Sequence, residues 1–238
     1  MSMTSFLPIH LLLLLMVSFG VNPSSSKNPE KGFRMIFDGK TFNGWEGDRS
    51  VWRIENGTLI GEVTPEKPIK TNSFLIWRGG QPADFEFKAE YRINKEGNSG
   101  VNYRSEELPD IKYAVKGYQA DIDGANTYTG QNYEERGRGF LAMRGQRATL
   151  EAGKPPIISK DAVGESETLK SYIRQNDWNE IHLVVKGNNM KHYINGVLMS
   201  ESTDLDPGHA KSSGLLCLQA HVGERMKVEF RKVRLKHL

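Results

Sequence analysis

Gly117-Tyr118-Gln119-Ala120-Asp121-Ile122-Asp123 separates into two chemically different faces when the stretch is read as a β-strand. The two-residue period of a strand puts Tyr118, Ala120 and Ile122 on one face. Gln119, Asp121 and Asp123 lie on the other. The first face suits a hydrophobic core, whereas the second cannot be buried without water. The stretch therefore predicts either a wet sheet surface or the floor of a binding site.

Two segments before this stretch alternate in the same way. Residues 84–92 put aromatic side chains opposite charged ones, and residues 98–104 put apolar side chains opposite polar ones. If the three strands share a sheet, they place one set of polar side chains on a common surface. That set is Glu90, Arg92, Asn102, Arg104, Gln119, Asp121 and Asp123.

The rest of the chain reads as short strands separated by turns. Asn56-Gly57 and Asn195-Gly196 are strong hairpin signals. Only residues 165–173 resemble a helix, and residues 124–138 read as a long polar loop with interleaved aromatic residues. About a dozen strands and one short helix predict an all-β fold, a jelly-roll sandwich of two antiparallel sheets.

Composition excludes several classes of partner. The formal net charge of the 238 residues is only +3, with basic and acidic residues interspersed, so neither nucleic acid nor an anionic membrane is an expected partner. Cys217 is the only cysteine, which excludes an internal disulfide framework. We interpret Cys217 as a strand residue rather than as a nucleophile.

The N-terminal region differs from the rest. Residues 11–17 form an apolar run too short to span a bilayer, and Ser18-Phe19-Gly20 offers small residues for cleavage. We expect a signal peptide over residues 1–20, a linker over residues 21–31 and one domain over residues 32–238. A secreted or periplasmic location follows from this interpretation, and no transmembrane segment is expected.

A series of short motifs carries a family resemblance. They are Phe37-Asp38-Gly39-Lys40, Gly44-Trp45, Asp84-Phe85-Glu86-Phe87, Asn98-Ser99-Gly100, Tyr103-Arg104, the stretch of residues 117–123, Trp178-Asn179-Glu180, Asn195-Gly196 and Leu218-Gln219-Ala220-His221. In this order they resemble the 3-keto-disaccharide hydrolase domain family, over essentially all of residues 32–238. The resemblance implies a concanavalin A-like jelly roll that acts on oxidised sugars, with a sugar 3-dehydrogenase acting upstream.

The chemistry that this resemblance implies needs few kinds of side chain. A ketone at C3 of a glycoside makes the proton on C2 acidic, so a base can remove it and the substituent on C1 can then leave by elimination. Such a site needs a base, an electropositive group or a metal near the C3 oxygen, and an acid for the leaving group.

Three residues are the candidate catalytic groups: Glu90, Asp121 and His221. Each has an ordinary structural alternative. Glu90 could be a surface partner of an arginine, His221 a hydrogen-bonded residue at a strand end, and Asp121 part of an exposed strand face.

Other polar and aromatic residues are candidates for binding. We expect Asn102, Arg104, Gln119, Glu134, Arg136 and, as a stacking platform, Trp77 to contact the sugar. Asp121, Asp123 and His221 could instead hold a divalent metal ion, although no third ligand stands in the same motif as the two aspartates. A non-catalytic carbohydrate-binding module and an ordinary glycosidase with paired carboxylates are the alternative functions.

Overall fold

Two β-sheets lie face to face in the computed structural model, which describes Met1 and residues 30–238. The expected signal peptide and most of the expected linker fall on residues 2–29, outside the described residues. In the part of the chain that is described, no helix is long and apolar enough to cross a membrane.

The larger sheet has ten strands. Its order is β12-β11-β15-β14-β13-β6-β17-β4-β3, and β1 pairs with β17. Its strands are β1 (Arg34–Met35), β3 (Trp52–Glu55), β4 (Thr58–Val63), β6 (Phe85–Ile93), β11 (Arg147–Leu150), β12 (Ile157–Ile158), β13 (Asn179–Lys186), β14 (Asn189–Ile194), β15 (Val197–Asp204) and β17 (Met226–His237).

The smaller sheet has seven strands in the order β10-β9-β8-β7-β16-β5-β2. They are β2 (Trp45–Glu46), β5 (Ser73–Trp77), β7 (Asn98–Glu107), β8 (Val115–Asp123), β9 (Asn132–Glu135), β10 (Gly139–Ala142) and β16 (Leu215–Ala220). All strand pairs of both sheets are antiparallel except β11 with β15. This sheet carries the stretch of residues 117–123 near its middle, as strand β8.

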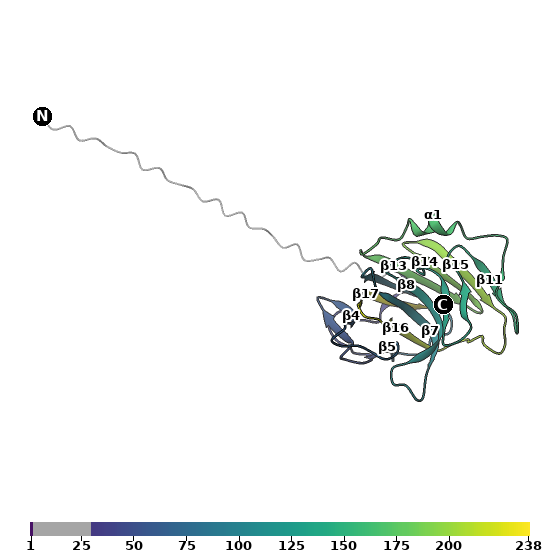
Figure 1. Ribbon diagram of the computed structural model, residues 1–238, viewed down its shortest axis with the longest axis horizontal. Coiled ribbons are helices and arrows are strands. Elements are labelled where there is room, and N and C mark those ends of the chain that lie inside the picture. The colour runs from purple at the N-terminus through teal and green to yellow at the C-terminus, as the bar shows by residue number, and fades with distance from the viewer. Residues whose placement is uncertain (2–29) are drawn as a thin grey trace.

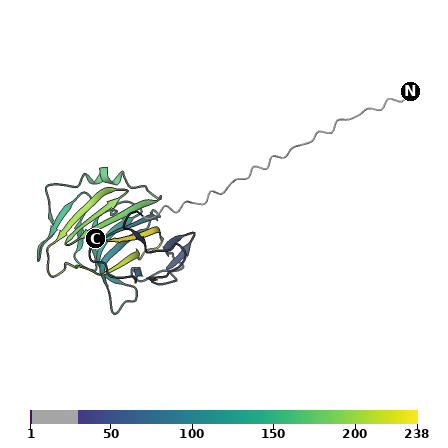
Figure 2. The ribbon, with the colours of Figure 1, turned by 180° about the vertical axis from the view of Figure 1, so that it is seen from behind.

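The helix α1 (Ser166–Lys170) lies beside the edge of the sandwich, near β14 and β15 (Figure 1). Seen from behind, it occupies the same position, and the β3–β4 hairpin lies at the opposite end from β11 (Figure 2). The observed helix is shorter than the residues 165–173 expected from the sequence. The prediction of an all-β sandwich with one short helix is confirmed.

Alternation explains why the two sheets pack against each other. In β6, Phe87 and Tyr91 are fully buried in the core, whereas Glu90 faces away from it. In β8, the side chains of Tyr118, Ala120 and Ile122 enter the same core, as the sequence predicted. The rings of Phe85 and Tyr103 meet edge to face, 6.1 Å apart, and so join the two sheets.

Turn chemistry fixes the register of the hairpins. Asn56 and Gly57 both have positive φ, at 49° and 77°, and Asn195 and Gly196 do as well, at 51° and 80°. Two successive residues with positive φ are what a two-residue turn of the primed type requires. Both predicted hairpins are therefore confirmed, as β3–β4 and β14–β15.

Candidate functional site

The outer face of the seven-stranded sheet, which points away from the sandwich core, carries a polar cavity of about 410 Å³. We call it the first cavity. It lies over β8, β9 and β16 and is lined by Asn72, Asn98, Gln119, Asp121, Tyr128, Tyr133, Glu135, Arg136, Phe140, Gln219 and His221. Gln119, Asp121 and His221, which the sequence analysis selected, thus line one cavity. Arg136 is also part of its wall.

Asp121 forms the buried acidic centre of the first cavity. It is 7% exposed, and its carboxylate accepts hydrogen bonds from Gln119 Nε2 at 2.6 Å and Gln131 Nε2 at 2.9 Å. Burial raises the pKa of this carboxyl to about 7, because the two glutamine hydrogen bonds offset only part of the desolvation. A carboxylate with such a pKa can accept a proton near neutral pH.

Glu135, on the adjacent strand β9, is the second carboxyl of the first cavity. It is 7% exposed and accepts hydrogen bonds from Asn72 Nδ2 at 3.2 Å and Gln219 Nε2 at 3.3 Å. Burial raises the pKa of Glu135 despite these bonds and the nearby charges of Arg136 and His221. Its charge also contributes to the raised pKa of Asp121, so the two carboxyls interact.

A chain of amides holds the floor of the first cavity in place. Gln219 Nε2 donates to Gln119 Oε1 at 2.9 Å, which leaves Gln119 Nε2 to donate to Asp121. Gly100 stands opposite Asp121 in the sheet, and a Cβ there would come within 2.5 Å of the Gln119 side chain. The glycine therefore provides the space in which Gln119 lies.

Aromatic side chains form the rim. Tyr128 and Phe140 are 40% and 48% exposed, and their rings stack with centroids 6.0 Å apart. Phe140 also meets Tyr133 edge to face at 5.2 Å. Exposed aromatic faces beside convergent polar groups are suited to the apolar face and the hydroxyls of a sugar ring.

Asp123 stabilises the loop that follows β8. Its carboxylate accepts the backbone N–H groups of Thr127, Tyr128 and Thr129 at 2.8 to 2.9 Å and the Thr129 hydroxyl at 3.0 Å. These bonds shape the loop that carries Tyr128 to the rim. Within residues 30–238, no three His, Cys, Asp or Glu side chains are gathered as a metal-binding group. The expectation that Asp121, Asp123 and His221 form such a group is wrong.

Glu90 does not share a surface with Asp121. It lies on β6 in the ten-stranded sheet, on the face away from the core, and pairs with Arg231 at 2.6 Å and Lys232 at 2.5 Å. The expectation of one common polar surface is therefore wrong for Glu90 and for its neighbour Arg92. The structure supports the ordinary alternative for Glu90, a surface ion pair.

Arg104 is buried within the protein and does not face the first cavity. A bulge in β7 after Tyr103 and a φ of 46° at Arg104 interrupt the alternation of the strand. Its guanidinium donates to the carbonyl oxygens of Ala83, Gly187 and Lys211 at 2.7 to 3.1 Å. The expectation that Arg104 contacts the sugar is wrong, because these hydrogen bonds tie three separate connections together.

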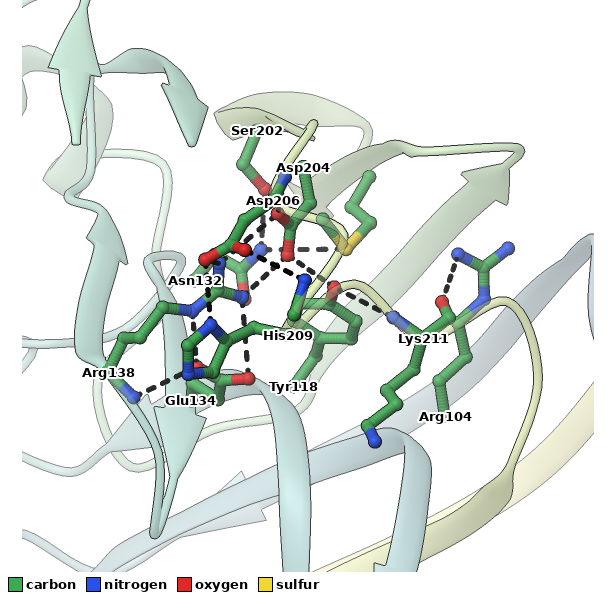
Figure 3. Close-up of polar contacts among 12 residues, drawn as sticks. Arg104, Tyr118, Asn132, Glu134, Arg138, Ser202, Asp204, Asp206, His209 and Lys211 are labelled. Atoms are coloured by element: carbon green, nitrogen blue, oxygen red, sulfur yellow. Dashed lines mark hydrogen bonds and ion pairs between the residues drawn. The ribbon is translucent and has the colours of Figure 1, made fainter. Parts of the chain in front are cut away.

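Three other expected binding residues lie elsewhere. Trp77 is 4% exposed and belongs to the core, so it cannot be a stacking platform. Asn102 faces the same side as Gln119, but it is fully buried and does not line the first cavity. Glu134 accepts hydrogen bonds from Arg138 in a separate network around Asp204 (Figure 3).

The first cavity is completed by seven residues that were not expected as site residues from the sequence: Asn72, Asn98, Tyr128, Tyr133, Glu135, Phe140 and Gln219. Tyr133 and Glu135 stand in the segment expected to be a loop, part of which is strand β9. The signal that could have pointed to them is the interleaving of aromatic and charged residues in residues 124–138, because residues 133–135 show no apolar–polar alternation.

Comparisons with known proteins identify the family of the chain. The chain belongs to the 3-keto-alpha-glucoside-1,2-lyase-like domain family, which it matches over residues 32–236. The predicted family resemblance is thereby confirmed. Family membership places the chain among hydrolase-like or carbohydrate-binding domains.

Individual relatives add detail. A curated 3-keto-disaccharide hydrolase of Bacteroides thetaiotaomicron is 39% identical over 84 residues, which are 32% of this chain and 29% of that relative's length. A Parabacteroides distasonis protein provisionally named a glycosyl hydrolase has 19% identity and a TM-score of 0.57, with 87% of this chain and 94% of that chain covered. The carbohydrate-binding module CBM66 of Bacillus subtilis has 17% identity and a TM-score of 0.55, with coverages of 81% and 95%. At such identities, these two structures show the shared fold alone.

The raised pKa of Asp121 predicts a stability change that a variant can reveal. The folded protein binds this proton more tightly than the unfolded chain, whose carboxyl titrates near the ordinary value of 3.8. Stability therefore falls as the pH rises from about 4 through about 7. Asp121→Asn removes this pH-dependent loss of stability, because asparagine does not ionise. The Gln131 amide can rotate so that its oxygen accepts a hydrogen bond from the new asparagine NH₂ group. We expect the variant to be more stable than the wild type at pH 8, by on the order of 2 kcal/mol.

Urea unfolding at pH 4 and pH 8 measures this difference. At pH 4 the two proteins should differ by less than about 1 kcal/mol, since both side chains are then largely uncharged. A variant that is less stable than the wild type at pH 8 would show that the Asp121 carboxylate is well solvated in the folded protein.

Proposed function

We propose that this protein cleaves glycosides whose C3 hydroxyl has been oxidised to a ketone. The observation that carries the proposal is a buried carboxyl, Asp121, with a pKa of about 7 at the floor of a cavity with an aromatic rim. The family and the 39%-identical relative support the choice of a 3-keto substrate. A secreted or periplasmic location, with a sugar 3-dehydrogenase that supplies the ketone, is part of the same proposal.

Asp121 is the proposed base. Its carboxylate removes the proton from C2, and the electron pair of the C2–H bond becomes an enolate that extends to the C3 oxygen. Gln119 and Gln131 hold the two carboxylate oxygens, so the base is oriented before the substrate arrives. A base whose pKa lies near the operating pH combines a large ionised fraction with useful basicity.

Arg136 is the proposed stabiliser of the enolate. Its side chain is about one third exposed, and its Nε lies 3.8 Å from Glu135 Oε1, so the pair is loose. Its Nη2 donates to the Thr71 hydroxyl at 2.6 Å, which holds the guanidinium beside the cavity. A guanidinium in this position can donate to the oxygen on which negative charge develops.

Glu135 is the proposed acid. Its raised pKa keeps the carboxyl protonated to a higher pH than an ordinary glutamic acid. When the enolate collapses, the bond between C1 and the leaving oxygen breaks and Glu135 gives its proton to that oxygen. Water then adds to C1 and gives one of its protons to Glu135, Asp121 loses its proton to the solvent, and C2 takes a proton from the solvent. The net reaction is hydrolysis, achieved by elimination followed by hydration.

Phe140 should contribute to substrate binding through its exposed ring. Replacing it by alanine removes one face of the aromatic rim and leaves both carboxyls in place. We expect Phe140→Ala to raise KM about five- to tenfold with little change in kcat. Tyr172→Ala is a matched control, because Tyr172 is 50% exposed and does not line the first cavity. Equal effects of the two substitutions on KM would contradict the proposed rim.

A pair of substrates tests the proposed function. The protein is incubated with a 3-keto-disaccharide and with its unoxidised parent, and release of free sugar is followed. We expect cleavage of the keto sugar alone. Cleavage of the parent alone would indicate an ordinary glycosidase with paired carboxylates. Measurable binding without cleavage of either sugar would indicate a carbohydrate-binding module, the other function that this fold serves.

A further inference from the structure

A second cavity of about 350 Å³ lies beyond Glu135 and Arg136. These two residues line both cavities, so the second cavity begins where the first one ends. Along β8 the first cavity lies over Asp121 and Gln119, and the second lies over Gly117 and Lys116. Four strand residues correspond to about 13 Å, so a ligand that reaches both cavities must be longer than one sugar ring.

The wall of the second cavity rests on a network of buried charges (Figure 3). Asp204 is 1% exposed and accepts both Arg138 Nη2 and the Tyr118 hydroxyl at 2.5 Å. Arg138 Nε also donates to Glu134 at 2.6 Å. Because each charge is paired, this network is a fixed support with little freedom to rearrange.

His209 lies beside this network, and one of its ring nitrogens already has a hydrogen-bond partner. Its Nδ1 lies 2.7 Å from Asp206 Oδ2, and Asp206 is itself 4% exposed. The imidazole side chain is 54% exposed and lines the second cavity. Among the described residues no hydrogen bond to His209 Nε2 is found. Asp206 thus orients a ring whose other nitrogen is available to a ligand.

The lining also indicates what kind of ligand fits. It consists of charged or ionisable side chains and glycines alone, and it includes Glu106, Lys116, Arg138, His209 and Lys211. Such a wall offers many hydrogen-bond donors and acceptors, and its apolar surface comes from the methylene stems of charged side chains rather than from whole apolar side chains. Lys116 and Lys211 lie beside Glu106, and Arg138 pairs with Glu134 and Asp204, so most charges of this wall are already paired and a neutral ligand is favoured over an ionic one.

We propose that the second cavity binds the leaving group of the substrate as a neutral, polyhydroxylated ring, and that His209 Nε2 hydrogen-bonds to one of its hydroxyls. This inference rests on the proposed function. It places the bond to be cleaved at the junction of the two cavities, beside Glu135 and Arg136. His209 is then a residue that determines which leaving group is accepted.

Two keto substrates of different size test this assignment. Methyl 3-keto-glucoside fills the first cavity alone, whereas a 3-keto-disaccharide reaches into the second. We expect the wild type to prefer the disaccharide in kcat/KM by at least about tenfold. His209→Ala should lower kcat/KM for the disaccharide about tenfold and leave the methyl glycoside within about twofold. His209→Gln, which retains a hydrogen-bonding group, should recover part of the loss, and His237→Ala should change neither substrate.

Each other outcome has a distinct meaning. A wild type that cleaves both substrates equally well would overturn the second cavity as a subsite and leave the proposed function intact. An equal loss on both substrates in His209→Ala, or no loss on either, would also overturn it. If neither substrate is cleaved, the proposed function fails, and the subsite is tested by measuring the dissociation constants of the methyl glycoside and the disaccharide. Equal dissociation constants for the two ligands would overturn the subsite. Tighter binding of the disaccharide that is lost in His209→Ala would support it.

Discussion

Asp121→Asn should reduce kcat/KM for a 3-keto-disaccharide by about 10³-fold. The substitution keeps the shape of the side chain and removes the only proposed proton acceptor of the first cavity, and positioned acid–base groups typically contribute factors of 10² to 10⁴. Binding of the substrate should change little, because the glutamines and the aromatic rim remain. The predicted gain in stability at pH 8 means that loss of activity cannot be attributed to unfolding.

The pH dependence of the wild type gives the same assignment an independent check. Because Asp121 must be ionised and Glu135 protonated, kcat/KM should pass through a maximum, and one limb of its pH profile should titrate near 7. Glu90→Gln is the matched control, since Glu90 lies on the other sheet. It should retain wild-type activity and the same pH profile. If Glu90→Gln abolished cleavage while Asp121→Asn did not, the assignment of the site would be refuted.

Arg104→Met should cause the largest loss of stability, about 3 kcal/mol or more. The side chain is 2% exposed, and its removal leaves the carbonyl oxygens of Ala83, Gly187 and Lys211 without their donor. Hydrogen bonds to a charged group typically contribute about 1.5 to 3 kcal/mol each, so losing three of them is expensive even though Ala83, Gly187 and Lys211 are themselves exposed. Arg104→Lys should be nearly as damaging, because an ammonium group cannot reproduce the fork of the guanidinium.

Urea unfolding with Arg92→Met as the comparison measures this effect. Arg92 pairs with Glu229 at 2.7 Å on the exposed side of the ten-stranded sheet, and the loss of such a pair costs about 1 kcal/mol or less. A loss in Arg104→Met no larger than that in Arg92→Met would show that water can reach the three carbonyl groups. It would also reopen a role for Arg104 in binding.

Local alternation predicted the part of the site that lies on β8. Tyr118 and Ile122 enter the core and Gln119 and Asp121 line the first cavity, because the strand period is a property of the backbone alone. His221 follows β16 and reaches the same cavity. These positions needed no knowledge of the remaining chain.

Long-range pairing was not available from the sequence, and it accounts for the wrong prediction at Glu90. Strand β6 alternates as clearly as β8, yet its hydrogen bonds go to β13 and β17 in the other sheet. Alternation states which residues share a face of one strand, whereas sheet membership depends on contacts distant in sequence. The ion pairs of Glu90 with Arg231 and Lys232 come from residues more than 140 positions away.

Two local irregularities hid other features. The bulge at Arg104 turns a side chain of β7 away from the face that strict alternation assigns to it. Strand β9 has Tyr133 and Glu135 on the face that lines the first cavity and Asn132 and Glu134 on the face that joins the polar network around Asp204. A strand between two polar environments lacks the apolar period by which strands are recognised. Glu135 therefore lay in a predicted loop.

The proposed role of Asp121 is to remove the C2 proton of a 3-keto-glycoside in the first cavity. Cleavage of a 3-keto-disaccharide in D₂O, followed by NMR at early times, tests it directly. Elimination and hydration replace the C2 proton with solvent hydrogen, so the released keto sugar should carry deuterium at C2 in the wild type. Asp121→Asn should form the labelled product about 10³-fold more slowly. Rapid release of a keto sugar that retains its original C2 proton would contradict this role.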